Sequence, residues 1–191
     1  MVGALWPGMR FGTWTRAKKS ILLACALAAL VGTASASQFA RFDRDTQVRN
    51  SELILRGRVD TVSAHWNEAR SAIYSDAEVT VEEVWKGAPS SDRVVVRVLG
   101  GTVGTVRLEV DGAPRLAAGE DVVLFLRRAD GAYTPWGMMF GKYRIVGPAG
   151  AAVAVGLEPP SGEERGAFRP YSAKLIDLRR EVVSMVAKEA P

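Results

Sequence analysis

The sequence is poor in the two side chains that most often bind metals or form covalent links. Its 191 residues include one cysteine, Cys25, and one histidine, His65. One cysteine cannot form an intramolecular disulfide, and one imidazole cannot supply the several histidine ligands of a zinc site. We therefore expect no disulfide framework, no metal site of cysteine and histidine residues, and no cofactor.

Motifs of nucleophilic and phosphate-binding enzymes are also missing. The chain has no G-x-S-x-G, S-x-x-K or H-E-x-x-H pattern. The glycine-rich stretch at 100–104 lacks the Lys-Ser/Thr ending of a phosphate-binding loop, so we interpret it as a flexible connection between strands. A Ser-His-Asp triad would have to use His65, which we expect to be an exposed loop histidine, with both partners coming from elsewhere in the fold.

The positive charge is concentrated at the N-terminus. The formal net charge is +4 and the pI about 9.5, but the first 36 residues hold four bases and no acid. The 155 residues after Ala36 carry 21 bases and 21 acids, and are formally neutral. The basic pI therefore gives no support for nucleic-acid binding.

The first 36 residues have the three parts of a secretory signal peptide. Basic residues at 16–19 precede an apolar run, Ile21–Val31, and small residues follow up to Ala36 in an A-x-A arrangement. The apolar run has 11 residues, whereas a membrane-spanning helix needs about 20. We expect cleavage near Ala36, no transmembrane span in the mature chain, and a periplasmic or extracellular protein.

Two details of this segment have alternatives. Met9 is a plausible start in place of Met1, because it gives the signal a more ordinary basic region. Leu22–Cys25 loosely resembles a lipobox, which would make Cys25 a lipidated N-terminus. Against lipidation, few apolar residues precede Cys25 and the hydrophobic sequence continues beyond it.

Most of the mature chain has the pattern of β-strands. Apolar and polar residues alternate, and turn residues recur every 8–14 positions with no intervening helical pattern. Gly57 interrupts the first strand, which indicates a bulge or the close approach of another backbone. Asp130-Gly131 predicts a hairpin. The predicted strands are 52–61, 73–85, 93–99, 105–110, 121–127, 133–138, 140–146 and 151–155.

These strands predict a mainly β fold, a single antiparallel β-barrel of OB type with about seven or eight strands and one C-terminal α-helix. The segments are a lead-in at 37–51, the barrel at 52–156, a loop at 157–170 and the helix at 171–189. Ser172 is the expected N-cap, and Tyr171 is the residue before it. The apolar stripe predicted to clamp the helix on the barrel contains Leu175, Leu178, Val182, Met185 and Val186.

Paired carboxylates offer one route to catalysis, because two of them can act as general acid and base on a sugar. The candidate pairs are Glu82/Glu83, Glu109/Asp111 and Glu120/Asp121. Neighbouring residues on a strand point to opposite faces, so only Glu109 and Asp111 would share one. Asp43 and Asp45 carry oxygen ligands suited to calcium, but the spacing of a calcium loop is absent, and we predict no metal site.

Aromatic side chains are the stronger indication of a binding surface. Several lie near predicted strand ends, where they can stack on sugars or contact a protein. Trp85 and Phe140 alternate with apolar residues and are expected in the core, whereas Trp66 is expected to be exposed. The candidate binding residues are His65, Trp66, Tyr74 and Trp136.

Three strand segments resemble a known domain family. They are Leu55–Val59, then Val79–Gly87, then Gly119–Leu126 with its Gly-Glu start and Phe-Leu end. Together they are similar to the netrin-like domain of tissue inhibitors of metalloproteinases, over roughly residues 52–146. The resemblance implies an OB-type barrel with a flanking helix in a stable exported protein. Those inhibitors chelate zinc through an N-terminal cysteine, which the mature chain lacks.

The leading hypothesis is an exported, non-enzymatic β-barrel that binds a protein or an envelope glycan through loops at one barrel end. A secreted hydrolase that uses carboxylates or a serine without a recognised motif is one alternative, and it predicts a deep polar pocket with titratable groups. An exported protease inhibitor is another, and it predicts an exposed edge strand or N-terminal strand.

Overall fold

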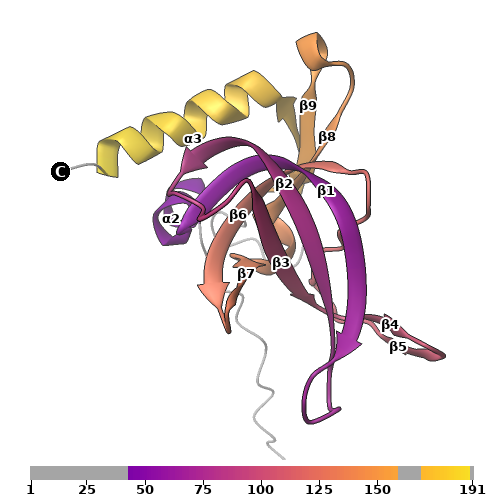
Figure 1. Cartoon of the computed structure of the whole chain (residues 1–191). Helices are drawn as coiled ribbons and strands as arrows, with labels where there is room; N and C mark the ends of the chain where they lie inside the picture. The colour runs from indigo at the N-terminus through magenta and orange to yellow at the C-terminus, as the bar shows by residue number, and fades with distance from the viewer. Residues whose placement is uncertain (1–42, 159–168, 190–191) are drawn as a thin grey trace, which may run out of the picture. The chain divides into compact units, whose positions relative to one another are not determined.

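The structure is a computed structural model that describes residues 43–158 and 169–189. The predicted signal peptide and its cleavage site lie outside these residues. Within them β-strands predominate, with two α-helices and two short 3₁₀-helices (Figure 1). The elements are α2 (Arg44–Asn50), β1 (Leu53–Trp66), β2 (Ile73–Lys86), β3 (Arg93–Leu99), β4 (Gly101–Val103), β5 (Val106–Leu108), β6 (Asp121–Ala129), β7 (Ala132–Pro135), η1 (Met138–Gly141), β8 (Lys142–Val146), η2 (Ala149–Ala151), β9 (Val153–Leu157), β10 (Pro170–Lys174) and α3 (Leu175–Glu189).

Eight strands form one sheet, and β4 and β5 pair separately as a hairpin. The large sheet has the order β1-β2-β3-β7-β6-β8-β9-β10, and β1 also pairs with β6. All its pairs are antiparallel except β3 with β7, which are parallel where Val96 lies opposite Tyr133. The expectation of a purely antiparallel sheet was therefore wrong. The pairings lead from β1 through β2, β3, β7 and β6 back to β1, and an odd number of strands in such a cycle forces one parallel pair.

Gly57 has the role that its position in the strand predicted. The register between β1 and β2 shifts next to it, and a Cβ at this residue would lie 2.5 Å from the carbonyl oxygen of Thr80. Any other side chain would therefore push the two strands apart at this point. The prediction of a close backbone approach is confirmed.

Alternate residues of the strands point into a first hydrophobic core. Every second residue in the central part of β6 belongs to this core. Val96 of β3 and Tyr133 of β7, which form the parallel strand pair, also belong to it. The members in β6 are Val122, Leu124 and Leu126. The other buried members come from β1, β2 and β3 and from the segment before β6. They are Leu53, Leu55, Val59, Ala77, Val79, Val94, Val98 and Leu116.

A second core lies on the opposite face of β1 and β6, beneath α2 and α3. The intervening residues of β6, Val123 and Phe125, are buried there with Trp85 and Tyr143. The predicted apolar stripe of the C-terminal helix packs into this core, with Leu178 and Val182 fully buried. The stripe is therefore confirmed as a clamp on the sheet.

The N-terminal boundary of that helix was predicted wrongly. Residues 170–174 form β10, paired with β9, and the helix begins at Leu175. Ser172 is thus a strand residue opposite Val155 and not the N-cap. Tyr171 does pack on the second core, but from a strand. Sheet pairing outweighs the local capping signal because β9 offers a complete row of backbone partners.

The hairpin after β6 was predicted correctly at its turn and wrongly at its end. Asp130 and Gly131 both have positive φ, and Ala129 pairs with Ala132. Strand β7 stops at Pro135, however, where residues 133–138 were expected to continue. A left-handed turn at Gly137 and Met138 then leads into η1, so β8 starts at Lys142.

Helix α2 is attached to the second core by Arg44. Asp43 caps the helix by accepting a 2.8 Å hydrogen bond from the backbone N–H of Thr46. The guanidinium carbon of Arg44 lies 4.8 Å from the ring centre of Tyr143, 5.0 Å from that of Tyr171 and 5.6 Å from that of Phe125. Of the predicted calcium candidates, Asp43 is thus a helix cap, and Asp45 pairs with Arg49 on the same helix.

Candidate functional site

One end of the sheet gathers most of the candidate binding residues. There β1 ends, β2 begins and β3 ends, and the β4–β5 hairpin projects (Figure 1). His65 lies opposite Tyr74, and Tyr74 lies opposite Leu99. A Cβ at Gly101 would lie 2.4 Å from the Ser75 hydroxyl, so the hairpin starts in close contact with β2. We call these strand ends and the hairpin the hairpin end of the sheet.

A network of charged side chains lies on one face of this end. Arg97 donates two hydrogen bonds of 2.7 Å to the Asp76 carboxylate, and His65 Nε2 lies 3.1 Å from the same group. The hydrogen bonds from Arg97 lower the pKa of Asp76, although partial burial acts in the opposite direction. Asp76 is therefore ionised at neutral pH and serves as an acceptor.

The geometry around His65 does not form a nucleophilic triad with a serine. Its Nδ1 lies 3.1 Å from the backbone carbonyl oxygen of Trp66, while Nε2 faces Asp76. Ser63 lies opposite Asp76 in the strand register, but both ring nitrogens of His65 already face other atoms. A triad histidine needs one nitrogen for its carboxylate and the other for the serine.

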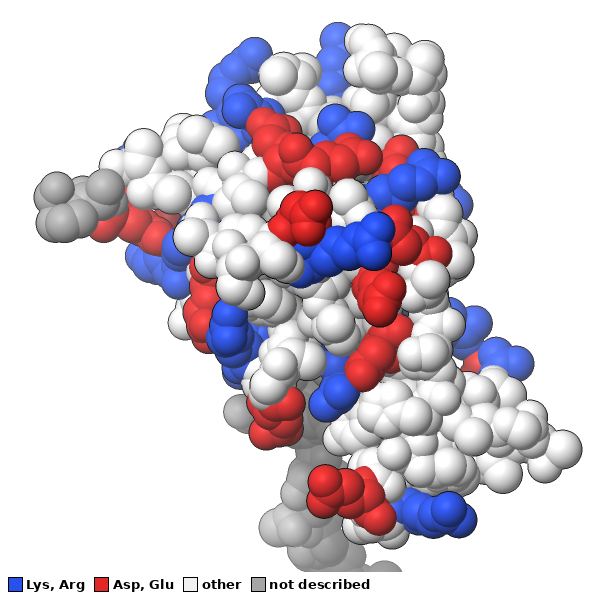
Figure 2. All heavy atoms as spheres, in the orientation of Figure 1, with Lys and Arg blue, Asp and Glu red and all other residues white. Residues whose placement is uncertain are grey.

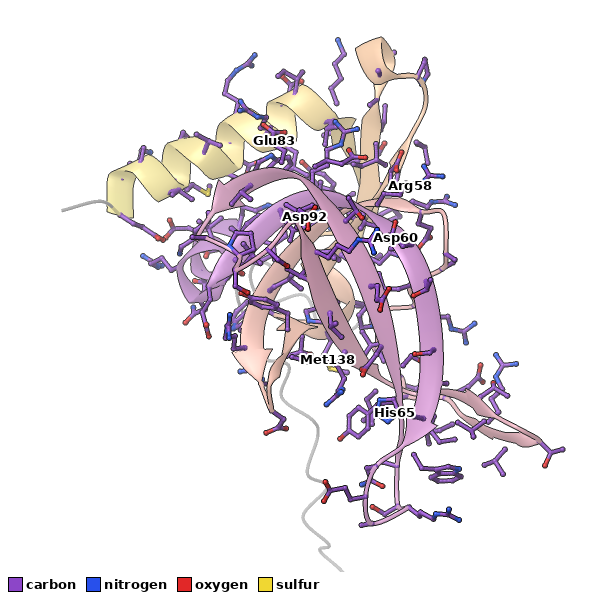
Figure 3. All side chains as sticks on the ribbon, in the orientation of Figure 1. Arg58, Asp60, His65, Glu83, Asp92 and Met138 are labelled. Atoms are coloured by element: carbon purple, nitrogen blue, oxygen red, sulfur yellow. The ribbon has the colours of Figure 1, made fainter. Side chains whose placement is uncertain are left out.

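His65 and Trp66 belong to β1, which corrects the expectation that His65 lies in a loop, and Tyr74 belongs to β2 as its strand pattern predicted. Figure 3 shows His65 near the end of β1. The rings of His65 and Tyr74 are stacked with centres 6.4 Å apart. Trp66 lies opposite the buried Ile73, points to the other face of the sheet and is half-buried, whereas we had expected it to be exposed.

Trp136 lies in a different part of the fold. It follows β7 directly, and its backbone N–H donates a 2.8 Å hydrogen bond to the carbonyl of Phe125 on β6. Its side chain is half-buried. The rings of His65 and Tyr74 are therefore in contact with each other. Trp66 follows His65 in β1 and lies on the opposite face, whereas the backbone of Trp136 is hydrogen-bonded to β6.

A cavity of about 240 Å³ opens at the hairpin end, and the sequence did not reveal it. Val98 and Leu116 of the first core are among its lining residues, and we call the apolar part of the lining that they form the floor of the cavity. Ser75 is also at the wall, with its hydroxyl donating to the carbonyl of Gly100 at 2.7 Å. The remaining lining residues are Leu99, Gly100, Gly101, Thr102, Arg107, Leu108, Glu109, Val110, Ala113, Pro114 and Arg115.

Three charged side chains stand at this cavity. Arg107 Nη2 lies 2.5 Å and Arg115 Nη2 lies 2.6 Å from Oε1 of Glu109, and all three side chains are more than half exposed. Arg107 and Glu109 are two apart along the chain, and so project from one face of the hairpin. That alternation was visible in the sequence, but the contribution of Arg115 required the fold.

Basic partners neutralise most of the predicted carboxylate pairs. Burial raises the pKa of Glu83, but hydrogen bonds from Trp85 and Arg179 outweigh it and leave that pKa lowered. Glu109 is shared by two arginines, as described above. At the other candidate carboxylates, ion pairs join Arg56 to Glu82, Lys142 to Glu120 and Arg58 to Asp121. A general acid would need a raised pKa, whereas the pKa values of Asp43, Asp76 and Glu83 are all lowered by their hydrogen-bond partners.

Charges of both signs are mixed over the face that β1 and β2 present in Figure 2. In the parts of the chain that the structure describes, no three His, Cys, Asp or Glu side chains group so that they could hold a metal ion. Among those same residues, no helix combines the length and apolarity needed to span a bilayer.

Comparison with known proteins assigns no class to this fold and site. No protein-family model matches the chain. A search of curated proteins likewise finds no match.

Proposed function

We propose that the chain is an exported, non-enzymatic binding protein that takes its ligand, a protein or an envelope glycan, at the hairpin end of an OB-type barrel. The observation that carries this proposal is the preformed cavity, which combines an apolar floor with charged groups at its opening. Binding sites typically have this composition, in which apolar surface supplies affinity and a few polar groups orient the ligand.

The barrel part of the proposal rests on the strand pairing. The cycle β1-β2-β3-β7-β6 returns to β1, and the first core lies on its inward face. An OB barrel has five strands in a Greek-key arrangement and binds through one face and its loops. The resemblance to netrin-like domains points to the same architecture, and in both cases a helix flanks the barrel.

The binding part of the proposal is supported by how the cavity is built. The hydrogen bond from Ser75 to Gly100 and the close approach of Gly101 to β2 hold the hairpin in place. A wall held in this way does not need to form when the ligand arrives, which lowers the entropic cost of binding. The volume suits one small group, such as a side chain or a single sugar unit.

Absence of catalysis is the interpretation that the charged groups favour. At the candidate pairs, Glu82 faces Arg56 and Glu120 faces Lys142, while His65 faces Asp76 and a backbone carbonyl. Groups held in this manner position strands and hold charge. They lack the nucleophile–base contact on which a hydrolase depends.

A matched pair of tryptophan substitutions tests the site. Thr102→Trp places an indole in the cavity lining, whereas Thr105→Trp places one at the exposed turn of the same hairpin. A photo-crosslinking amino acid at position 102 should first identify the ligand in intact cells, with position 105 as the reference. Thr102→Trp should then weaken binding of that purified ligand by about tenfold.

Equal binding by the two tryptophan variants would refute the cavity as the site. If no crosslink forms at either position, a binding role for this end of the sheet is refuted. Turnover of the identified ligand by the purified protein would refute the non-enzymatic part of the proposal.

A further inference from the structure

We infer that the cavity at the hairpin end binds the C-terminal residue of a partner polypeptide, with its apolar side chain on the cavity floor and its α-carboxylate on Arg107 and Arg115. This inference rests on the proposed function and gives its ligand a chemical class. It follows from three properties of the cavity: the apolar floor, the arginine pair and the free edge of the hairpin.

The floor fits an apolar side chain. Val98 and Leu116 belong to the first core, and Leu108, Ala113 and Pro114 extend the apolar surface around them. Among the residues that the structure describes, none of those lining the cavity is aromatic. Protein sites for sugars usually stack the ring on an aromatic face, so the lining favours an aliphatic group over a glycan.

The arginine pair fits a carboxylate. Arg107 and Arg115 reach the same oxygen, Oε1 of Glu109, and so both point at one place beside the cavity. Each guanidinium has five N–H donors, of which these contacts use only a small part. The charged lining residues are two arginines and one glutamate, which leaves one net positive charge for an incoming anion.

Within a polypeptide, the C-terminal residue is the place where an apolar side chain and a carboxylate lie next to each other. An aspartate or glutamate side chain brings a carboxylate but no apolar group beside it. A C-terminal residue carries both on one Cα, so that one can enter the cavity while the other stays at its rim.

The backbone of the hairpin supplies the reason to prefer a peptide over a short fatty acid. Within the described residues, Val106–Leu108 pair only with β4, so the outer edge of β5 has N–H and C=O groups open to a partner strand. A peptide can add to such an edge, while a fatty acid has no amides with which to do so.

Three small probes separate these contributions. We would add the tetrapeptide Gly-Ser-Gly-Val as the free acid, the same peptide as the C-terminal amide, and valerate, to isotope-labelled protein expressed from the full sequence. Nuclear magnetic resonance would follow the backbone amides of Ser75, Thr102 and Leu108. The free acid should shift these signals at concentrations about tenfold below those needed for the amide or for valerate.

Two sets of substitutions locate the carboxylate. The double variant Arg107→Gln/Arg115→Gln should weaken binding of the free acid by about tenfold. Arg180→Gln is the matched control, because Arg180 on α3 is also an exposed arginine in an exposed ion pair. The signals of the two cores should be unchanged in both proteins, which shows that the fold is intact.

Equal binding of acid and amide, or an unchanged affinity of the double variant, would overturn the carboxylate inference. Equal binding of valerate and the free acid would overturn the peptide part. These failures differ from failure of the proposed function, because in either case the crosslinked ligand would still bind less well to Thr102→Trp than to Thr105→Trp. If that difference also disappears, the site itself is wrong.

Discussion

Arg97 on β3 binds both carboxylate oxygens of Asp76 on β2, through Nε and Nη2, at 2.7 Å each. The two residues lie directly opposite each other in the strand register. His65 on β1 approaches the same carboxylate from the other side, at 3.1 Å. One ionised aspartate thus connects three neighbouring strands, and a bidentate arginine contact is the strongest geometry for such a link.

The first prediction concerns acid. Because the pKa of Asp76 is lowered in the folded protein, its contribution to stability is present above the unfolded value of 3.8 and is lost as the pH falls through the folded pKa. Asp76→Asn should cost about 1–3 kcal/mol at neutral pH. As the pH falls below about 4, the free energy of unfolding of this variant should also decrease less than that of the wild type. Urea unfolding at a series of pH values measures both effects, and parallel acid profiles would contradict the assignment.

The second prediction concerns backbone packing in β1. Gly57→Ala should destabilise the protein by about 2–3 kcal/mol, because the added methyl group would lie 2.5 Å from the Thr80 carbonyl oxygen. Gly150→Ala is the matched control, since nothing lies within 4 Å of a Cβ there, and its effect should stay within about 0.5 kcal/mol. Thermal and urea unfolding give both values. Similar costs at the two glycines would refute the close approach of β1 and β2.

The third prediction concerns the attachment of α2. Arg44→Ala should cost about 2–4 kcal/mol, because the guanidinium is in contact with three aromatic rings and its side chain is only 10% exposed. Arg49→Ala, on the same helix, removes a side chain that is 56% exposed and should have almost no effect. Urea unfolding compares the two variants, and a cost at Arg44 no larger than at Arg49 would show that the ring contacts do not hold α2.

The fourth prediction concerns alkali. Burial raises the pKa of Tyr143 above its ordinary value of 10.0, although Arg44 acts against this. A raised folded pKa means that the contribution of neutral Tyr143 to stability is complete below about pH 10 and is lost as the pH rises through the folded value. Tyr143→Phe should therefore flatten the alkaline loss of stability seen in wild type. An equally steep loss in the variant would place the titrating group elsewhere.

The fifth prediction concerns processing of the N-terminus. Protein recovered from the periplasm or the medium of an exporting bacterium should begin at Ser37, since Ala34-Ser35-Ala36 matches the peptidase pattern. N-terminal sequencing and intact mass measure this directly. A lipid-modified N-terminal Cys25 would favour the lipobox alternative, and an intact first segment on cytoplasmic protein would contradict export.

Local patterns in the sequence were sufficient to predict most individual elements. The alternation at 73–85 and 93–99 predicted β2 and β3, Asp130-Gly131 predicted the hairpin between β6 and β7, and helical spacing predicted the buried stripe of α3. Each of these signals involves residues within one element or one turn, where backbone geometry and side-chain direction follow from neighbours in the chain.

Other features depend on which distant segments meet. The parallel contact of Val96 with Tyr133 and the strand at 170–174 both depend on partners far away in the sequence. The cavity also depends on contacts between distant segments, because Ser75, Arg107 and Arg115 lie on separate parts of the chain.

The sequence by itself therefore determined the alternating strands, their tight turns and the apolar face of the last helix, because these follow from side-chain periodicity along a short stretch of backbone. Only the tertiary structure decided the strand order, the second core and the position of two arginines beside one cavity. Those depend on how the whole chain satisfies its backbone hydrogen bonds and buries its apolar surface at the same time.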